Sequence, residues 1–235
     1  MRVLVTGGGT GIGRGIAQAL IDNGDEVLIL GRRQSVIEGT ATEIGAEPIQ
    51  GDVTKDPEGI LRRTGPISGI VHCAGHADHQ PIGRWTDQQW RELWSVHVQG
   101  PAMLSQAFAK QCDGPGSIVL IGSTLSERPA IGTIPYASAK GAILAMARGM
   151  AAELASRQIR VNAILSGVVP TEMIGPRGNQ SRAEVLESLT AIHPMGRLGT
   201  PNDIGDATVY LTHAPWVTGA VLTVDGGMLV GGHAV

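Results

Sequence analysis

The sequence predicts an α/β protein in which a doubly wound, seven-stranded parallel sheet forms a single domain. Short apolar runs recur along the chain, and helical patterns separate most of them. This alternation is typical of right-handed βαβ crossovers, which place successive strands parallel in one sheet. Only 3% of the residues are aromatic and 34 are glycine, so we expect a core of Val, Ile, Leu and Ala with many tight turns.

Strands are expected where apolar, often β-branched residues run together over strand length. The first such run, RVLVT, begins at the second residue, and GSIVLIG and IRVNAIL are similar runs in the second half. We expect seven strands, at residues 2–6, 26–30, 47–51, 69–73, 116–122, 159–165 and 219–224.

Helices are expected between these strands, where apolar residues recur with a helical period. The clearest patterns lie at residues 12–23, 34–44, 87–111 and 136–157.

The main irregular segment, residues 166–200, is rich in Gly and Pro and carries one short helical pattern at 181–190. Residues 171–199 are therefore a candidate lid. Thr200 then reads as a helix N-cap, because Pro201 follows at the first turn and Asp203 stands three residues after the cap.

The composition excludes several classes of protein. A chain of 235 residues can bury a large core within one domain, and no repeat or linker divides residues 1–235. The net charge of −3 without a long basic run leaves no footprint for nucleic acid, and no apolar run suggests a membrane span. Cys73 and Cys112 show no metal-ligand spacing, and the start is not that of a signal peptide, so a cytoplasmic location is expected.

A glycine-rich turn joins the first strand to the first helix. Glycines permit a tight turn, let backbone amides approach a pyrophosphate, and place it at the helix N-terminus. A lone glycine cluster could be only a flexible turn, but its place after strand one of an alternating chain indicates a dinucleotide site. The predicted contacts are Gly7, Thr10, Gly11, Ile12 and Gly13.

The residues after the second strand suggest which dinucleotide binds. An acidic residue there usually accepts hydrogen bonds from the ribose 2′-hydroxyl of NAD, whereas this chain has Arg32 and Arg33. A guanidinium can pair with a 2′-phosphate, so NADP(H) is the predicted cofactor. Arg32 is the leading contact and Arg14 a candidate helper; the alternative is that both arginines after the strand are solvated loop residues.

Tyr136 and Lys140 stand four residues apart in a long helical pattern, so both side chains lie on one face. A nearby ammonium stabilises a phenolate and would lower the pKa of the tyrosine towards the working range of a general acid. Alone, such a pair is common in helices and proves little.

In the order of its motifs, the chain resembles the short-chain dehydrogenase/reductase family over essentially its whole length. The motifs are TGxxxGxG from Thr6, an acid after strand three, an xxAG turn, a serine thirteen residues before YxxxK, and a closing Val-Asp-Gly-Gly. The positions that carry the last four are Asp52, Ala74, Gly75, Ser123, Tyr136, Lys140 and residues 224–227. The resemblance implies a Rossmann-type fold and a nicotinamide cofactor.

The resemblance also implies roles for single residues. Tyr136 would donate a proton in reduction, Ser123 would polarise the substrate carbonyl, and Lys140 would bind the nicotinamide ribose and tune Tyr136. The alternative for Ser123 is a simple hydroxyl at the end of a strand.

The same resemblance implies the remaining cofactor contacts. Asp52 and Val53 would contact the adenine, Ala74 and Gly75 would form the turn beside the cofactor, and Val169 and Thr171 would contact the nicotinamide amide. For Asp52 the alternative is a turn or helix cap before Thr54.

Two positions depart from the family pattern. His72 and Cys73 stand where the family commonly has two asparagines, and His97 replaces the asparagine of a proton relay to the lysine. Three interpretations of His97 stay open: it serves the relay, it is a packed histidine, or it marks lost activity. A ring that donates, accepts and titrates near neutrality is suited to a relay.

Two further groups of residues have competing interpretations. His76, Asp78 and His79 resemble metal ligands, but a polar loop beside the substrate entrance is the simpler interpretation and no metal is predicted. Trp90, Leu93, Trp94 and Phe108 recur with a helical period, which favours core or interface packing over stacking on a substrate. Family members usually assemble through this helix, so a homotetramer or homodimer is expected.

The leading functional prediction is an NADP(H)-dependent ketoreductase, or in reverse an alcohol dehydrogenase, acting on a small molecule. The alternatives are a non-catalytic NADP(H)-binding protein and a lyase with an anion pocket; Lys140 and the complete glycine turn count against the lyase. The substrate cannot be identified from the sequence, although Arg128, Arg177 and Arg197 are candidate anchors.

Overall fold

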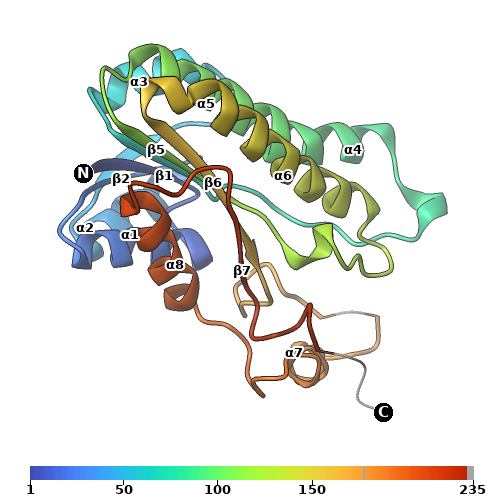
Figure 1. The fold of residues 1–235 in the computed structure, drawn as a ribbon. Coiled ribbons are helices and arrows are strands. Elements are labelled where there is room, and N and C mark those ends of the chain that lie inside the picture. Colours follow the sequence, from blue (N-terminus) through green and yellow to red (C-terminus); the bar gives the residue numbers. More distant parts are fainter. Residues whose placement is uncertain (177, 232–235) are drawn as a thin grey trace.

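The computed structural model describes residues 1–176 and 178–231. Within them, seven parallel strands form one sheet in the order β3-β2-β1-β4-β5-β6-β7, so the predicted fold class is confirmed (Figure 1). The strands are β1 (Arg2–Thr6), β2 (Glu26–Gly31), β3 (Glu47–Gln50), β4 (Gly69–His72), β5 (Gly116–Ile121), β6 (Ile159–Ser166) and β7 (Val221–Val224).

Helices connect the strands on both faces of the sheet. The α-helices are α1 (Gly11–Asp22), α2 (Gln34–Ile44), α3 (Pro57–Thr64), α4 (Asp87–Trp94), α5 (Gly100–Gln111), α6 (Ile134–Leu154), α7 (Arg182–Ala191) and α8 (Pro201–His213). Short 3₁₀ turns are η1 (Ile82–Arg84), η3 (Thr124–Ser126) and η4 (Ala155–Arg157), and η2 (Ser95–Gln99) is a π-turn.

Helices cover both faces of the sheet (Figure 1), and a layer of buried hydrophobic side chains lies between the sheet and the helices on each face. Alternate side chains of a strand enter opposite layers: Leu4 of β1 belongs to the layer under α3, α5 and α6, whereas Val3 and Val5 belong to the layer under α1, α2 and α8. All three are completely buried. This burial on both faces explains why the strands read as continuous apolar runs.

The predicted helix at 87–111 is interrupted by the π-turn η2. The N–H of Gly100 donates to the carbonyl of Ser95, five residues back instead of four. Pro101 has no N–H to give to the carbonyl of His97, which removes one regular helical bond at this point. This turn of the helix therefore contains one additional residue, and it includes His97, where the sequence departs from its family pattern.

Helix α3 lies outside the helical patterns named from the sequence; it is short, contains Gly59, and buries two apolar side chains, Ile60 and Leu61. It begins at Asp56, whose carboxylate accepts the N–H of Gly59 at 2.9 Å. By contrast, the predicted start at Thr200 is confirmed, since Thr200 and Asp203 form a reciprocal capping box.

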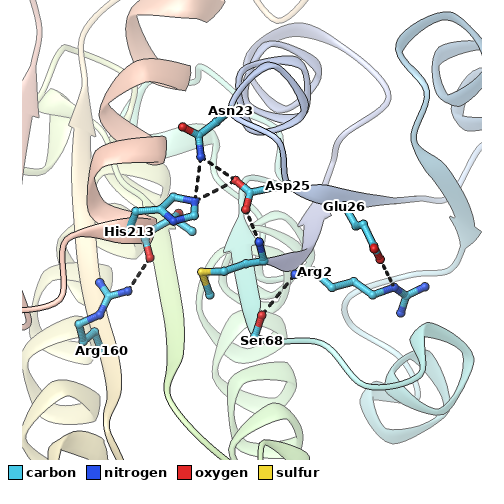
Figure 2. Close-up of polar contacts among 9 residues, drawn as sticks. Arg2, Asn23, Asp25, Glu26, Ser68, Arg160 and His213 are labelled. Atoms are coloured by element: carbon cyan, nitrogen blue, oxygen red, sulfur yellow. Dashed lines mark hydrogen bonds and ion pairs between the residues drawn. The ribbon is translucent and has the colours of Figure 1, made fainter.

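A polar network closes the end of the sheet at which β2 begins (Figure 2). Asp25 accepts hydrogen bonds from the amino terminus of Met1, from Asn23 at the end of α1, and from His213 at the end of α8. Burial raises the pKa of Asp25, but these bonds outweigh it and hold the pKa below its usual range. The network joins α1 and α8, which also pack closely along their length through Gly15 and Pro201.

The strand order reverses between β1 and β4, which lie side by side with Thr6 opposite His72. In a doubly wound sheet, a crevice opens at the carboxyl ends of the strands at such a reversal, and ligands bind there. The fold therefore places the glycine turn after β1 and the turn after β4 at one site.

Candidate active site

The glycine turn after β1 forms a cradle over the amino end of α1. Gly7 has a φ of +69°, and a Cβ at this position would lie 2.8 Å from the Cα of Ala74. A Cβ on Gly13 would come within 2.2 Å of the carbonyl oxygen of Gly7. Side chains at these two positions would collide with the main chain, so the turn needs glycine to close tightly at the amino end of α1, where main-chain amides and the helix dipole favour an anion. The residues present fit the pyrophosphate of a dinucleotide.

A cavity of about 730 Å³ extends from this cradle past the ends of β2 and β3. Arg32 and Arg33 line it, as does Lys55, a cation that the sequence reasoning passed over. The suggestion that Arg14 helps them is not supported, because its guanidinium is paired with Glu43 at 2.6 Å. The cavity thus offers three cationic side chains to a phosphate at this end.

Asp52 and Val53 line the same cavity. Oδ1 of Asp52 accepts the N–H and the hydroxyl of Thr54, at 3.0 and 2.8 Å. Burial raises the pKa of this carboxyl, but the bonds from Thr54 outweigh it and the pKa lies below its usual range. The turn that the sequence left open as an alternative is therefore present, and the adenine contact stays a prediction.

A second cavity, of about 650 Å³, continues the groove beyond the glycine turn. The two cavities share Gly7, Thr10, Ala74 and Gly75, so they form one continuous groove. The structure brings the four predicted catalytic residues together in this second cavity, from η2, the turn after β5 and helix α6. They are His97, Ser123, Tyr136 and Lys140.

Ser123 and Tyr136 are hydrogen-bonded to each other inside this cavity. Ser123 follows β5 and is only 9% exposed, and its Oγ also accepts the N–H of Leu125 at 3.2 Å. Tyr136 lies in the first turns of α6. Burial raises the pKa of Tyr136 to about 12, although the bond from Ser123 acts in the opposite direction. The phenol is thus protonated at neutral pH.

Lys140 lies one turn further along α6, with Nζ 5.6 Å from the centre of the Tyr136 ring. Nζ donates to the carbonyl of Ile121 at 2.7 Å, and burial lowers the pKa of this lysine to about 8. The spacing of Tyr136 and Lys140 predicts that the lysine lowers the pKa of the tyrosine. That expectation was wrong for the protein without ligand, because burial of the phenol is the larger effect.

His97 projects from the π-turn η2 against the ring of Tyr136, with centroids 5.1 Å apart. Its Nε2 lies 2.7 Å from the carbonyl of His76, which fixes the hydrogen on Nε2. The Nδ1 is buried without a partner among the described residues. Burial, with the nearby charge of Lys140, holds the pKa of His97 well below its usual range. The ring is therefore neutral, with a lone pair on Nδ1.

His72 and Cys73, which stand where the family commonly has two asparagines, make contacts of a different kind. Nε2 of His72 lies 2.9 Å from the hydroxyl of Ser105, and burial lowers the pKa of His72 to about 3. Thr6, for which the sequence reasoning proposed no separate role, accepts the N–H groups of Cys73 and Ala74 at 3.1 Å each. The turn beside the cofactor groove is thus supported from β1.

The candidate lid covers the same cavity. Val169 and Thr171 line it from the loop after β6, and Leu189 and Ile192 line it from α7 and its end. A Cβ on Gly11 would lie 2.9 Å from Cγ2 of Thr171, so the loop rests directly on the glycine turn.

The arginines named as candidate substrate anchors have different surroundings in the structure. Arg128 lines the catalytic cavity and donates to the carbonyl of Met228 at 3.1 Å. Arg197 instead forms a bidentate ion pair with Asp203, in which both N–O distances are 2.8 Å. Arg177 lies outside the described residues. Of the two described candidates, Arg128 is the one that lines the catalytic cavity.

The other groups singled out from the sequence lie as follows. His76 and His79 line the catalytic cavity, as expected for a loop beside its entrance. Leu93 and Phe108 are buried in the core, whereas Trp90 and Trp94 are 37% and 46% exposed. In the described part of the chain, no helix combines the length and apolar character needed to cross a membrane.

Comparisons with known proteins agree with this geometry. Residues 7–229 match a family model described as enoyl-(acyl carrier protein) reductase. Galactitol 2-dehydrogenase (L-tagatose-forming) of Cereibacter sphaeroides is 36% identical, over 96% of this chain and 94% of that protein. 2-(S)-Hydroxypropyl-CoM dehydrogenase 3 of Xanthobacter autotrophicus is 33% identical, over 96% and 95%. The crystal structure of a short-chain type dehydrogenase/reductase from Mycobacterium marinum superposes with a TM-score of 0.90 at 28% identity, covering 98% of this chain and 96% of the other.

Proposed function

Because the chain belongs to the short-chain dehydrogenase/reductase family, we propose that it is an NADP(H)-dependent ketoreductase that interconverts a ketone and a secondary alcohol. The observation that carries this proposal is the Tyr136 phenol, which shares one cavity with Ser123 and Lys140, and that cavity is continuous with the glycine cradle. The names of the two relatives above describe oxidation of an alcohol, which supports the same reaction in reverse.

In the reduction, the hydroxyl of Ser123 donates a hydrogen bond to the substrate carbonyl oxygen. The phenol of Tyr136 gives its proton to the same oxygen while negative charge develops there. The bound nicotinamide supplies the hydride. A tyrosine with a raised pKa suits this direction, because the phenol holds its proton until an alkoxide forms beside it.

Lys140 has two roles: it binds the cofactor, and it stabilises the negative charge of the Tyr136 phenolate. One of its three N–H groups is used by the carbonyl of Ile121, so the others can reach the nicotinamide ribose and a water molecule. After proton transfer, the ammonium stabilises the Tyr136 phenolate. Val169 and Thr171, which line the same cavity, would contact the nicotinamide amide.

We place His97 in the route by which Tyr136 regains its proton. The unpartnered Nδ1 of His97 can accept a hydrogen bond from a water that also contacts Lys140, whose charge is close enough to affect the imidazole. This interpretation needs a neutral ring, which the burial of His97 favours. A purely packed ring is the competing interpretation, supported by the edge contact with Tyr136.

NADP(H) is preferred over NAD(H) in this proposal. The groove carries Arg32, Arg33 and Lys55 where an acid would otherwise bind the ribose 2′-hydroxyl. A 2′-phosphate would meet charge-assisted donors in that position. Asp52 lines the same cavity, and its Oδ1 accepts both bonds from Thr54.

The second candidate function is a non-catalytic NADP(H)-binding protein. It is favoured by His97, which stands in place of the family's relay asparagine and whose Nε2 is already bonded to the carbonyl of His76. The Ser123–Tyr136 bond and the adjacent Lys140 favour the enzyme.

Two wider properties belong to the same proposal. The exposed Trp90 and Trp94 of α4 support an assembly of two or four copies through this helix. Cys73 and Cys112 are free thiols, which supports a reducing, cytoplasmic setting.

The deciding experiment is oxidation of NADPH and of NADH against a panel of ketones, ketoses, quinones and acyl thioesters, with polyols for the reverse reaction. We expect turnover of at least one carbonyl with NADPH, and its loss in Tyr136→Phe. Binding of NADPH without turnover of any panel member by wild type or mutant would favour the non-catalytic alternative.

A further inference from the structure

His193, just after α7, is 3% exposed and has a partner for each ring nitrogen. Nδ1 lies 2.7 Å from the carbonyl of Leu189, and Nε2 lies 3.4 Å from the main-chain nitrogen of Val168. A carbonyl can only accept and an amide N–H can only donate, so Nδ1 carries the hydrogen and Nε2 offers its lone pair. Both contacts together require the neutral ring in a single tautomer.

These two bonds join two segments of the chain that both line the catalytic cavity. Leu189 belongs to α7 and lines the cavity, whereas Val168 directly precedes Val169, which lines it from the loop after β6. The carbonyl of Val168 also accepts the N–H of Gly199 at 2.9 Å. Val168 is therefore held on one side by the ring of His193 and on the other by the chain that follows α7.

The other end of α7 is attached to the same loop. Arg182 donates to the carbonyl of Ile174 at 3.0 Å and to that of Thr171 at 3.3 Å. These bonds are exposed to solvent, where water competes for the same groups. The bonds of His193 are part-buried, so water competes with them less.

We propose that His193 is a positioning residue of the substrate cavity, which fixes α7 to the loop after β6. Its bond to Leu189 fixes the position of α7, and with it the apolar side chains of Leu189 and Ile192 that face a substrate in the cavity. Its bond to Val168 fixes the position of the next residue, Val169, and of Thr171, which contacts the glycine turn. The proposal rests on the proposed function only in calling this cavity the substrate site; the attachment itself is independent of activity.

The test compares three substitutions. His193→Leu removes the donor and the acceptor, whereas His193→Gln retains an amide N–H for Leu189 and a carbonyl oxygen for Val168. Glu187→Gln is the matched control, because Glu187 is an exposed residue of the same helix. Amide hydrogen exchange is followed in residues 167–174 and 182–192 of the protein without ligand. Loss of two modest hydrogen bonds should speed exchange there about threefold to tenfold in His193→Leu, with little change in the other two variants.

Steady-state kinetics with NADPH and ethyl acetoacetate, a β-ketoester, provides the second measurement. In His193→Leu the KM for the ketone should rise about threefold to tenfold while kcat and its pH profile change less than about twofold, because Tyr136 is untouched. His193→Gln should restore the KM. A structural role alone would lower the amount of folded enzyme, and hence apparent kcat, with no change in KM.

Unchanged exchange in folded His193→Leu overturns the proposal, as does a glutamine variant that behaves like leucine in both measurements. If His193→Leu does not fold, His193→Phe, which keeps a ring of similar volume, takes its place with the same criteria. A wild type that reduces no carbonyl refutes the proposed function, while the exchange comparison still decides whether His193 holds α7.

Discussion

The imidazole of His97 stands edge-on against the phenol ring of Tyr136, with centroids 5.1 Å apart and ring planes at 90°. The far side of the imidazole is fixed by the bond between Nε2 and the carbonyl of His76. Gly75 leaves room for the ring, since a Cβ there would lie 2.1 Å from Cε1 of His97. A larger side chain at position 75 would therefore displace the ring of His97 and so disturb its contact with Tyr136.

This relationship predicts that Gly75→Ala is destabilising. The added methyl group cannot coexist with the present position of His97, and overpacking of this kind costs about 1–3 kcal/mol. In the double variant with His97→Ala the clash is absent, so the combined loss of stability should be clearly smaller than the sum of the two single losses. Urea unfolding of the four proteins measures this; strictly additive losses would show that the two residues are not coupled.

Tyr136→Phe tests the proton donor. The substitution keeps the ring against His97 and leaves Lys140 in place, but removes the hydroxyl that is bonded to Ser123. Turnover should fall at least about a hundredfold, the usual contribution of a general acid, while NADPH affinity stays within a few-fold. Steady-state kinetics and a fluorescence titration give the two values, and near-normal turnover in the purified variant contradicts the mechanism.

The fold could be predicted from the sequence because a parallel sheet buried on both faces leaves continuous apolar runs such as RVLVT. The interruption at η2 could not, because apolar periodicity does not reveal one additional residue in a helical turn. Pro101 was the available signal, since its missing N–H frees the carbonyl of His97 from regular helical pairing. Helix α3 was missed because its boundary depends on the cap by Asp56 rather than on an apolar stripe.

The candidate site was predictable where chemistry depends on spacing, as for Tyr136 and Lys140, four residues apart on α6. It was not predictable where chemistry depends on surroundings. Burial sets the pKa of Tyr136, and burial is a property of the folded chain. The tautomer of His193 likewise depends on Leu189 and Val168, whose carbonyl and amide meet the ring only in the folded protein.

Arg32→Asp tests the choice of cofactor. A carboxylate would repel a 2′-phosphate and offer an acceptor to a ribose 2′-hydroxyl, so preference for NADPH over NADH should reverse. Loss of one charge-assisted contact corresponds to about 1.5–3 kcal/mol, or roughly tenfold to over a hundredfold in the ratio of kcat/KM values. Arg14→Gln is the control, because Arg14 is paired with Glu43 outside the cavity lining. An unchanged ratio in Arg32→Asp would mean that this arginine is only a surface residue.

Lys140→Met tests the buried ammonium through the dependence of stability on pH. Burial lowers the pKa of Lys140 from 10.5 to about 8, so between these values the unfolded chain binds more protons than the folded one. Stability attributable to this lysine therefore rises with pH across that window. Relative to Lys140→Met, the wild type should gain about 2 kcal/mol between pH 7 and 9.5. Denaturant unfolding at several pH values measures the difference, and parallel curves for the two proteins would contradict the assigned burial of charge.

His97→Asn and His97→Leu distinguish a relay from packing. If Nδ1 of His97 accepts a hydrogen bond from a relay water, Asn should keep most of the turnover, whereas Leu, with no donor or acceptor, should reduce it strongly. If the ring only packs against Tyr136, activity per folded molecule should stay nearly constant and the melting temperatures alone should shift. Turnover and melting temperature are therefore measured together, at several pH values. A folded His97→Leu enzyme as active as the wild type would remove His97 from the mechanism.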